Sequence, residues 1–300
     1  MVTVSCPGSI NIMGEHALIR AGKGIRLAIN RCVSVNLQKI SGSDLQIQSR
    51  LGYFKGSFQE LLSENNMTFL AACLEHFNRK QGLAIKIDDD LPSDVGLGSS
   101  AALVVALSKA LVKINQEDFD KKNMFSKIKN IIQAAQKGVG SGIDAAASLY
   151  GGMVVYDPLN NNIENLPLPP EICVLYSGKK TPTTEVVRFV ENQNPSQTLF
   201  TDMNAATDRA AQCAREQDWK SFGTAMNTYQ EYMIGLNLNT PELDQLCGLL
   251  MQNDEIYGAK IAGAGLGDCV IGIGKEGVSQ QYREHAGYIA ASAFGMHDYD

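Results

Sequence analysis

The chain lacks most features that mark secreted, membrane-spanning or nucleic-acid-binding proteins. Its seven cysteines are spread without any C-x-x-C pair, which disfavours a zinc site or a disulfide framework and suits reduced thiols. The longest apolar runs, such as AALVVAL, are far too short to span a membrane, and the N-terminus reaches charge and glycine too early for a secretory signal. The formal net charge is -6, and the basic residues are scattered along the chain instead of forming a stripe. We therefore expect a cytoplasmic protein with neither membrane nor nucleic-acid partners.

The commonest signatures of nucleotide-binding enzymes are also missing. There is no G-x-x-x-x-G-K-[ST] pattern and no protein-kinase catalytic loop or D-F-G triplet. Residues 94–102 read instead DVGLGSSAA, between a strand-like and a helix-like segment. The first N–H groups of a helix have no partner within it and suit an anion, and Gly96 and Gly98 allow close backbone approach. This pattern predicts a phosphate site, with an ordinary serine-capped helix as the alternative.

Length and composition favour two domains, because a chain of 300 residues with 44% apolar residues can bury a sizeable core. In the first half, residues 24–40 and 82–88 read as strands, and residues 99–114 and 123–137 as amphipathic helices. The segment YDPLNNNIENLPLPPEI then interrupts the pattern, because clustered Asn and Pro can neither hold a helix nor join a central strand ladder. We place the domain boundary there, near residues 157–170.

The second half has a different composition of elements. Four helical patterns follow the boundary, and AKIAG and DCVIGIG read as two short strands. The sequence therefore predicts an α+β second domain, with helices packed on an antiparallel sheet.

Three further motifs accompany the glycine-serine loop. PGSINIMGEHALI lies near the N-terminus, GVGSGIDAAASLYGG places Asp144 at an apparent helix start, and KIAGAGLGDCVIGIG is a second glycine-rich turn. In this order the four motifs resemble those of the GHMP kinase superfamily, and the match spans residues 7–274. Each motif alone is weak, but the set is specific.

The resemblance implies a two-domain fold, with a ribosomal-S5-domain-2-like N-terminal part and a ferredoxin-like C-terminal α/β sandwich. It assigns residues 1–160 to a domain that binds nucleotide and phosphate, and residues 161–300 to the C-terminal kinase domain. It also implies ATP and Mg²⁺ as cofactors, a small-molecule acceptor, and a homodimer as one candidate assembly.

Site residues are carried over from the same resemblance. Asp144 matches the catalytic Asp, which accepts the proton of the acceptor hydroxyl or orients that hydroxyl. An ordinary N-cap Asp is the alternative. Ser100 matches the serine that contacts magnesium. The residues implied to bind ATP are Gly96, Leu97, Gly98, Ser99, Ser100 and Ala101. Those implied to bind the acceptor are Glu15, His16, Asp144, Thr184, Gly263 and Ala264.

Within the superfamily, the mevalonate kinases are the most similar subfamily. Galactokinases follow GEH with Thr-Asp, whereas here Ala17, Leu18 and Ile19 follow it. SGIDAAASLYGG resembles the corresponding mevalonate kinase segment. Phosphomevalonate kinase stays open, because GDC at 267–269 resembles its third motif. The implied activity is phosphorylation of the primary hydroxyl of mevalonate, in isoprenoid biosynthesis.

Two positions depart from the family pattern. Mevalonate kinases commonly carry a lysine where this chain has Ser9, and a magnesium-binding Glu where it has Gln133. A neutral amide is a weaker ligand for Mg²⁺ than a carboxylate. Lys179 or Lys180 is a candidate to supply the missing positive charge. A protein of this fold that binds ligand without catalysis is therefore the rival hypothesis, although the phosphate loop, Ser100 and Asp144 are all retained.

Overall fold

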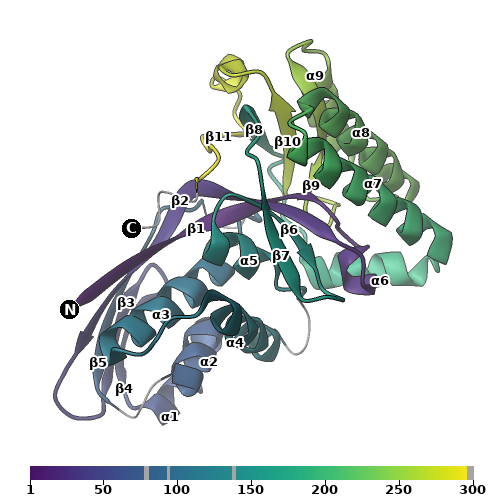
Figure 1. Ribbon diagram of the computed structural model, residues 1–300. Helices are drawn as coiled ribbons and strands as arrows, with labels where there is room; N and C mark the ends of the chain where they lie inside the picture. The colour runs from purple at the N-terminus through teal and green to yellow at the C-terminus, as the bar shows by residue number, and fades with distance from the viewer. Residues whose placement is uncertain (78–80, 93–94, 137–139, 296–300) are drawn as a thin grey trace.

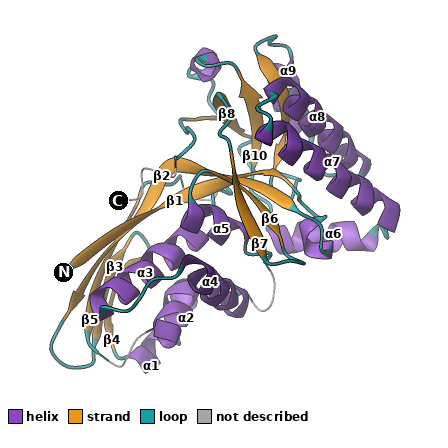
Figure 2. Cartoon of the chain, viewed as in Figure 1, coloured by secondary structure: helices purple, strands orange, loops and turns teal. Residues whose placement is uncertain are grey.

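The computed structural model describes residues 1–77, 81–92, 95–136 and 140–295. In these ranges the chain forms two sheets, each with helices packed against it (Figures 1 and 2). The predicted α+β class is confirmed.

The first sheet has seven strands in the order β4-β3-β5-β2-β6-β7, and β1 pairs with β2. Their bounds are β1 Val2–Met13, β2 Gly24–Lys39, β3 Leu45–Ser49, β4 Gly52–Gly56, β5 Leu83–Asp89, β6 Met153–Asp157 and β7 Asn162–Leu166. The associated helices are η1 Leu18–Arg20, α1 Phe58–Leu61, η2 Asn65–Met67, α2 Thr68–Phe77, α3 Ser99–Asn115, α4 Lys121–Ala135 and α5 Ile143–Tyr150.

Helices α3 and α5 pack directly on β1 and β2, and α2 and α4 pack against α3 (Figure 1). The predicted helix over residues 99–114 is thus confirmed as a central, buried element. Its small side chains, including Ala101 and Ala102, lie inside the core and allow the helix axis to approach the sheet closely. This packing fixes the N-termini of α3 and α5 beside the same strands.

The second sheet has four antiparallel strands in the order β11-β8-β10-β9. Its strands are β8 Glu171–Tyr176, β9 Ile256–Ala262, β10 Cys269–Gly274 and β11 Tyr288–Ile289. The helices of this half are α6 Thr183–Asn192, α7 Gln197–Arg215, α8 Trp219–Gly235, α9 Pro241–Met251 and η3 Val278–Tyr282. Because α8 and α9 contact β9, and α7 contacts α8, the predicted arrangement of helices on an antiparallel sheet is confirmed.

The chain passes from the first sheet to the second between β7 and β8. β7 pairs with β6 in the first sheet, and β8 belongs to the second, so the change falls between Leu166 and Glu171. Asn160 and Asn161 lie in the hairpin turn between β6 and β7, where Asn161 has a φ of 46°, and the asparagines that follow belong to β7. An edge strand needs partners on one side only, which is why β7 tolerates this composition.

The C-terminal segment returns to the first sheet. Asn30 N–H donates to the Ser292 carbonyl at 3.0 Å, and Phe294 N–H donates to the Ala28 carbonyl at 2.9 Å. The first sheet therefore depends on residues from both ends of the chain.

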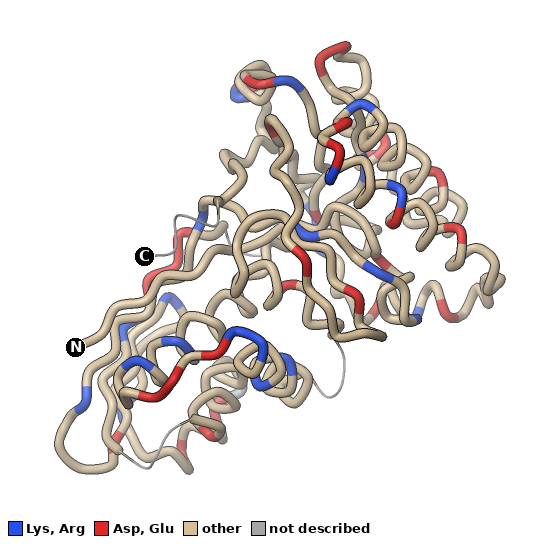
Figure 3. Tube along the Cα trace, in the orientation of Figure 1, with Lys and Arg blue, Asp and Glu red and all other residues tan. Residues whose placement is uncertain are grey.

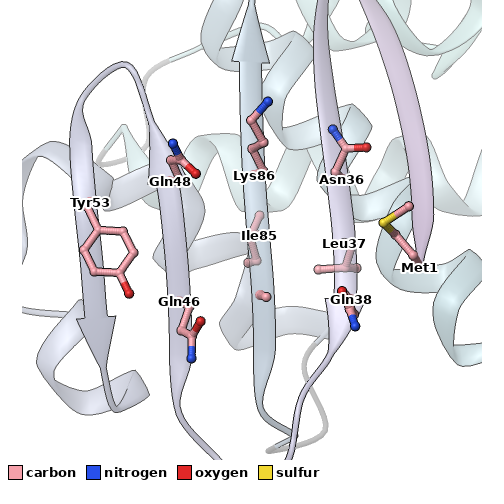
Figure 4. Close-up of a pocket in the computed structure, with 10 residues that line it drawn as sticks. Met1, Asn36, Leu37, Gln38, Gln46, Gln48, Tyr53, Ile85 and Lys86 are labelled. Atoms are coloured by element: carbon pink, nitrogen blue, oxygen red, sulfur yellow. The ribbon is translucent and has the colours of Figure 1, made fainter.

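The outer surface is mixed in charge. Lys and Arg alternate with Asp and Glu along both halves of the tube (Figure 3). A shallow hollow on the sheet carries polar side chains of neighbouring strands, including Gln46, Gln48 and Lys86 (Figure 4). None of the helices in the described ranges is long and apolar enough to cross a membrane.

Candidate active site

The glycine-serine loop turns into α3 as the sequence predicts. Gly96 and Gly98 have φ of 76° and 71°, and Gly98 is the N-cap. The first backbone bond of the helix runs from Ala102 N–H to the Gly98 carbonyl at 3.0 Å. The N–H groups of residues 99–101 therefore precede the helical ladder, at the positive end of its dipole, and suit a phosphate.

The two loop serines have different surroundings. Ser99 Oγ donates to Asp89 Oδ2 at 2.7 Å, and Arg50 pairs with the same carboxyl oxygen at 3.2 Å. Its hydroxyl is thus used to hold the loop to β5. Ser100 is exposed and borders the cavity above the loop, where its hydroxyl can meet a ligand.

Asp144 lies in the first turn of α5, whose N-cap is Gly142 at φ 83°. The alternative of an N-cap aspartate is therefore wrong, because residue 142 occupies that place. Asp144 Oδ1 pairs with Arg26 Nη1 at 3.0 Å, and its side chain is 43% exposed. A carboxylate held this way can still accept a proton from a ligand.

Arg26 was missed by the sequence analysis. It projects from β2, where it faces Asn11 of β1 in the strand register, and it is buried. Its Nε donates to Ser9 Oγ at 2.8 Å and its Nη2 to the Ser9 carbonyl at 3.1 Å. The guanidinium is therefore fixed by Ser9 on one side and by Asp144 on the other.

This arrangement places the positive charge of Arg26 beside Ser9, the position where the family commonly has a lysine. Ser9 is fully buried and acts as the anchor of Arg26. Among Lys179 and Lys180, which were the candidates for that charge, Lys180 borders the phosphate-loop cavity together with Arg26. Gln133 donates from Nε2 to the Gly140 carbonyl at 3.3 Å, so its amide supports the segment before α5.

Glu15 and His16 follow β1 and face the second half of the chain. Glu15 Oε1 pairs with Lys260 Nζ at 2.6 Å, and both side chains are almost fully buried. Glu15 Oε1 also accepts from Gly263 N–H at 3.3 Å, and its Oε2 has no partner among the described residues. The pair therefore joins β9 to the end of β1.

His16 Nε2 lies 2.8 Å from the Ala264 carbonyl, and its Nδ1 has no partner among the described residues. A carbonyl oxygen can only accept, so Nε2 carries the hydrogen. Burial lowers the pKa of His16, which favours the neutral ring. Nδ1 is then a buried acceptor.

A cavity of about 460 Å³ lies beside these residues, a size that suits a small metabolite. Of the residues assigned to the acceptor, it is bordered by Glu15, His16, Asp144, Thr184, Gly263 and Ala264. The structure thus brings the whole predicted acceptor set together. Leu18, Ile19, Ile143 and Val187 add an apolar wall that the motifs alone did not indicate.

Three cavities meet around the loop. The phosphate-loop cavity shares Arg26 and Asp144 with the acceptor cavity. On its other side it shares Ser99 and Ser100 with a third cavity, which has apolar walls that include Phe69 and Leu103. The third cavity suits the base of a nucleotide and the phosphate-loop cavity suits its phosphates. The acceptor cavity suits a small acceptor with polar groups.

Asp268 is a second residue that the motif analysis did not assign to the site. It lies in the turn between β9 and β10 and borders the phosphate-loop cavity. Burial raises its pKa to about 6. Among the described residues, no group of three or more His, Cys, Asp or Glu side chains is placed to hold a metal ion.

Two family models and several known proteins match this chain. Family models of the GHMP kinases N terminal domain and GHMP kinases C terminal match residues 66–152 and 210–287. The mevalonate kinase of Saccharolobus solfataricus is 25% identical, over 90% of this chain and 89% of its own length. A crystal structure of mevalonate kinase matches with a TM-score of 0.81 at 20% identity, covering 98% of this chain and 100% of that one. Lactococcus lactis galactokinase, solved with galactose, matches with a TM-score of 0.81 at 18% identity, over 98% of this chain and 94% of its own.

Proposed function

Because the chain belongs to the GHMP kinase family, we propose that it is a cytoplasmic mevalonate kinase, which transfers the γ-phosphoryl group of ATP to the primary hydroxyl of mevalonate in isoprenoid biosynthesis. One observation carries the proposal: the phosphate-loop cavity and the acceptor cavity meet at Arg26 and Asp144. An acceptor hydroxyl and a terminal phosphate that enter from the two cavities come together at this pair.

The nucleotide fits with its phosphates over the N-terminus of α3. Backbone N–H groups of residues 99–101 face the negative charge there, and the neighbouring apolar cavity around Phe69 and Leu103 suits a purine ring. Magnesium bound to the phosphates would neutralise part of their charge, with Ser100 as one protein ligand.

Phosphoryl transfer asks mainly for alignment and charge stabilisation. Asp144 orients the acceptor hydroxyl and takes its proton as the new P–O bond forms. The bond between the γ-phosphorus and the bridging oxygen breaks, and its electron pair leaves on ADP. Arg26, held in place by Ser9, faces the charge that develops on the transferring group.

The acceptor cavity favours a small branched acid with hydroxyl groups over a sugar. Leu18, Ile19 and Val187 form an apolar wall that suits a methyl-bearing carbon chain, and Asp144 and Thr184 supply polar groups at the same cavity. A sugar, which carries a hydroxyl on nearly every carbon, would leave several of them unpaired against this wall.

Phosphomevalonate is a weaker fit than mevalonate. Among the described residues that border the acceptor cavity, Arg26 is the one Lys or Arg, and it is already paired with Asp144. A phosphate on the acceptor needs further positive groups. The GDC segment that favoured this alternative contributes Asp268 to the phosphate-loop cavity, on the nucleotide side.

The test is an acceptor screen that follows ADP release with mevalonate, phosphomevalonate and galactose in parallel. We expect the highest kcat/KM for mevalonate. A better acceptor among the other two would replace the proposed substrate, and no ADP release with any of them would favour the ligand-binding protein without catalysis.

A substitution at Gly98 tests the nucleotide site. A methyl group there would lie 2.8 Å from Ser9 Oγ and 3.4 Å from Arg26 Nη2, so Gly98→Ala displaces the contacts that hold Arg26. We expect the affinity for a non-hydrolysable ATP analogue to fall by about tenfold, which corresponds to roughly 1.4 kcal/mol. Isothermal titration calorimetry measures this directly.

Gly42→Ala is the matched control. Gly42 has a similar φ of 81°, but a methyl group there meets nothing within 4 Å. Both variants should lose about 1–2 kcal/mol of stability from the left-handed backbone. Equal nucleotide affinity in the two variants would contradict the assignment of the loop.

A further inference from the structure

Asp268 is a buried acid whose position is not explained by protein contacts. The residue is 8% exposed, and Oδ1 is buried and has no hydrogen-bond partner among the described residues. Its backbone is well anchored, because its N–H donates to the Lys179 carbonyl at 2.7 Å and its carbonyl accepts from Ser177 N–H at 2.9 Å. Burial of an unpaired carboxylate is costly, so a partner from outside the protein is the physical expectation.

The carboxyl group lies against the phosphate loop. A methyl group added to Gly96 would meet Asp268 Oδ2 at 3.2 Å, and one added to Gly263 would meet the same atom at 3.4 Å. Asp268 borders the same cavity as Gly98, Ser100 and Asp144. The acid therefore faces the place where the N-terminus of α3 would receive a phosphate.

A carboxylate and a triphosphate repel each other at this range unless a cation lies between them. Arg26 and Lys180 lower the pKa of Asp268, but burial has the larger, opposite effect, and Arg26 is already engaged by Ser9 and Asp144. Magnesium binds to substrate phosphates together with one or two carboxylates. The combination of an orphaned acid and an anion site beside it matches that chemistry.

We propose that Asp268 is the protein carboxylate that binds the divalent cation of the nucleotide, across the phosphates from Ser100; this inference rests on the proposed ATP site. It also gives a physical reason for Gln133, whose amide is used by Gly140 and does not border the cavity in the described ranges. The cation would then join a loop of the first half to a turn of the second.

The experiment compares the affinity for AMP-PNP with excess Mg²⁺ and with EDTA, by titration calorimetry. In the wild type, Mg²⁺ should strengthen binding. In Asp268→Asn we expect the Mg²⁺ enhancement to shrink by at least about tenfold, while binding in EDTA stays equal or becomes tighter, because the repelling charge is gone. Asparagine keeps the shape and accepts the φ of 64° at this residue.

Glu185→Gln is the matched control, because it removes one exposed negative charge at the start of α6 without a place in the phosphate-loop cavity. Its Mg²⁺ enhancement should equal that of the wild type. An unchanged enhancement in Asp268→Asn would overturn the inference and leave the ATP site intact. Absence of AMP-PNP binding to the wild type under both conditions would overturn the proposed function and this inference with it.

A second measurement uses the wild type alone and does not depend on how the variant folds. In a crystal grown with Mn²⁺ and AMP-PNP, the anomalous signal of manganese should lie within coordination distance of the Asp268 carboxylate. A manganese ion bound to the phosphates but away from this carboxylate would refute the assignment.

Discussion

Replacement of Asp144 by asparagine is expected to lower kcat by at least about a hundredfold, which is the contribution typical of a positioned general base. Asparagine keeps the shape and much of the hydrogen bonding, but it removes the charge and the basicity. Nucleotide affinity should stay close to the wild-type value, because the backbone N–H groups of residues 99–101 are unchanged. Single-turnover ADP release and titration with AMP-PNP measure the two quantities separately.

Asp208→Asn provides the comparison for this variant. Asp208 pairs with Lys23 at 2.7 Å on a half-exposed surface, so its loss removes an aspartate and breaks an ion pair away from the described cavities. We expect its kcat to remain within about twofold of the wild type, as exposed pairs contribute little. Full activity in Asp144→Asn would refute the proposed role of this carboxylate.

Arg26→Gln is expected to lower kcat/KM by about a thousandfold, the lower end of the range for an arginine that stabilises a transferring phosphoryl group. Arg26→Lys keeps the charge but cannot bind Ser9 and Asp144 together through a planar fork, so it should recover only about tenfold of this loss. Steady-state kinetics with ATP and mevalonate varied in turn would show whether kcat or KM carries the change.

Arg31→Gln is the control from the same strand, since Arg31 donates to the Ala290 carbonyl and borders none of the three cavities in the described ranges. It should retain wild-type kcat/KM.

Ser9→Lys tests whether an added positive charge beside Arg26 increases the rate. It would force a second cation into a fully buried position beside Arg26, so we expect loss of stability and no gain in rate. A large gain in rate would show that Arg26 does not replace the family lysine.

The parts of the site that lie within one motif could be predicted from the sequence. The start of α3 at Ser99 and the place of Asp144 in the first turn of α5 follow from glycines that precede apolar helices. These are local features, because glycines that end a strand-like segment and precede a helical pattern lie within one short stretch of sequence.

Arg26 and Asp268 could not be found in this way. Arg26 is one of several polar residues in the long strand β2, so the sequence does not single it out. Its role depends on the pairing of β2 with β1, which brings it to Ser9. Asp268 was seen within GDC, but its closeness to Gly96 arises from the packing of one half of the chain on the other. That β7 is an edge strand is likewise visible only in the sheet order.

The return of the C-terminal segment to β2 has a consequence for folding during synthesis. Residues 292–294 pair with residues 28–30, a few positions beyond Arg26 on the same strand. Contacts between such distant parts of a chain form late and slow the folding reaction. The first half can collapse as it leaves the ribosome, but the strand that carries Arg26 gains this neighbour only after residues 292–294 have been translated. The setting of Arg26 is therefore completed by a segment that is translated well after the other strands of the first sheet.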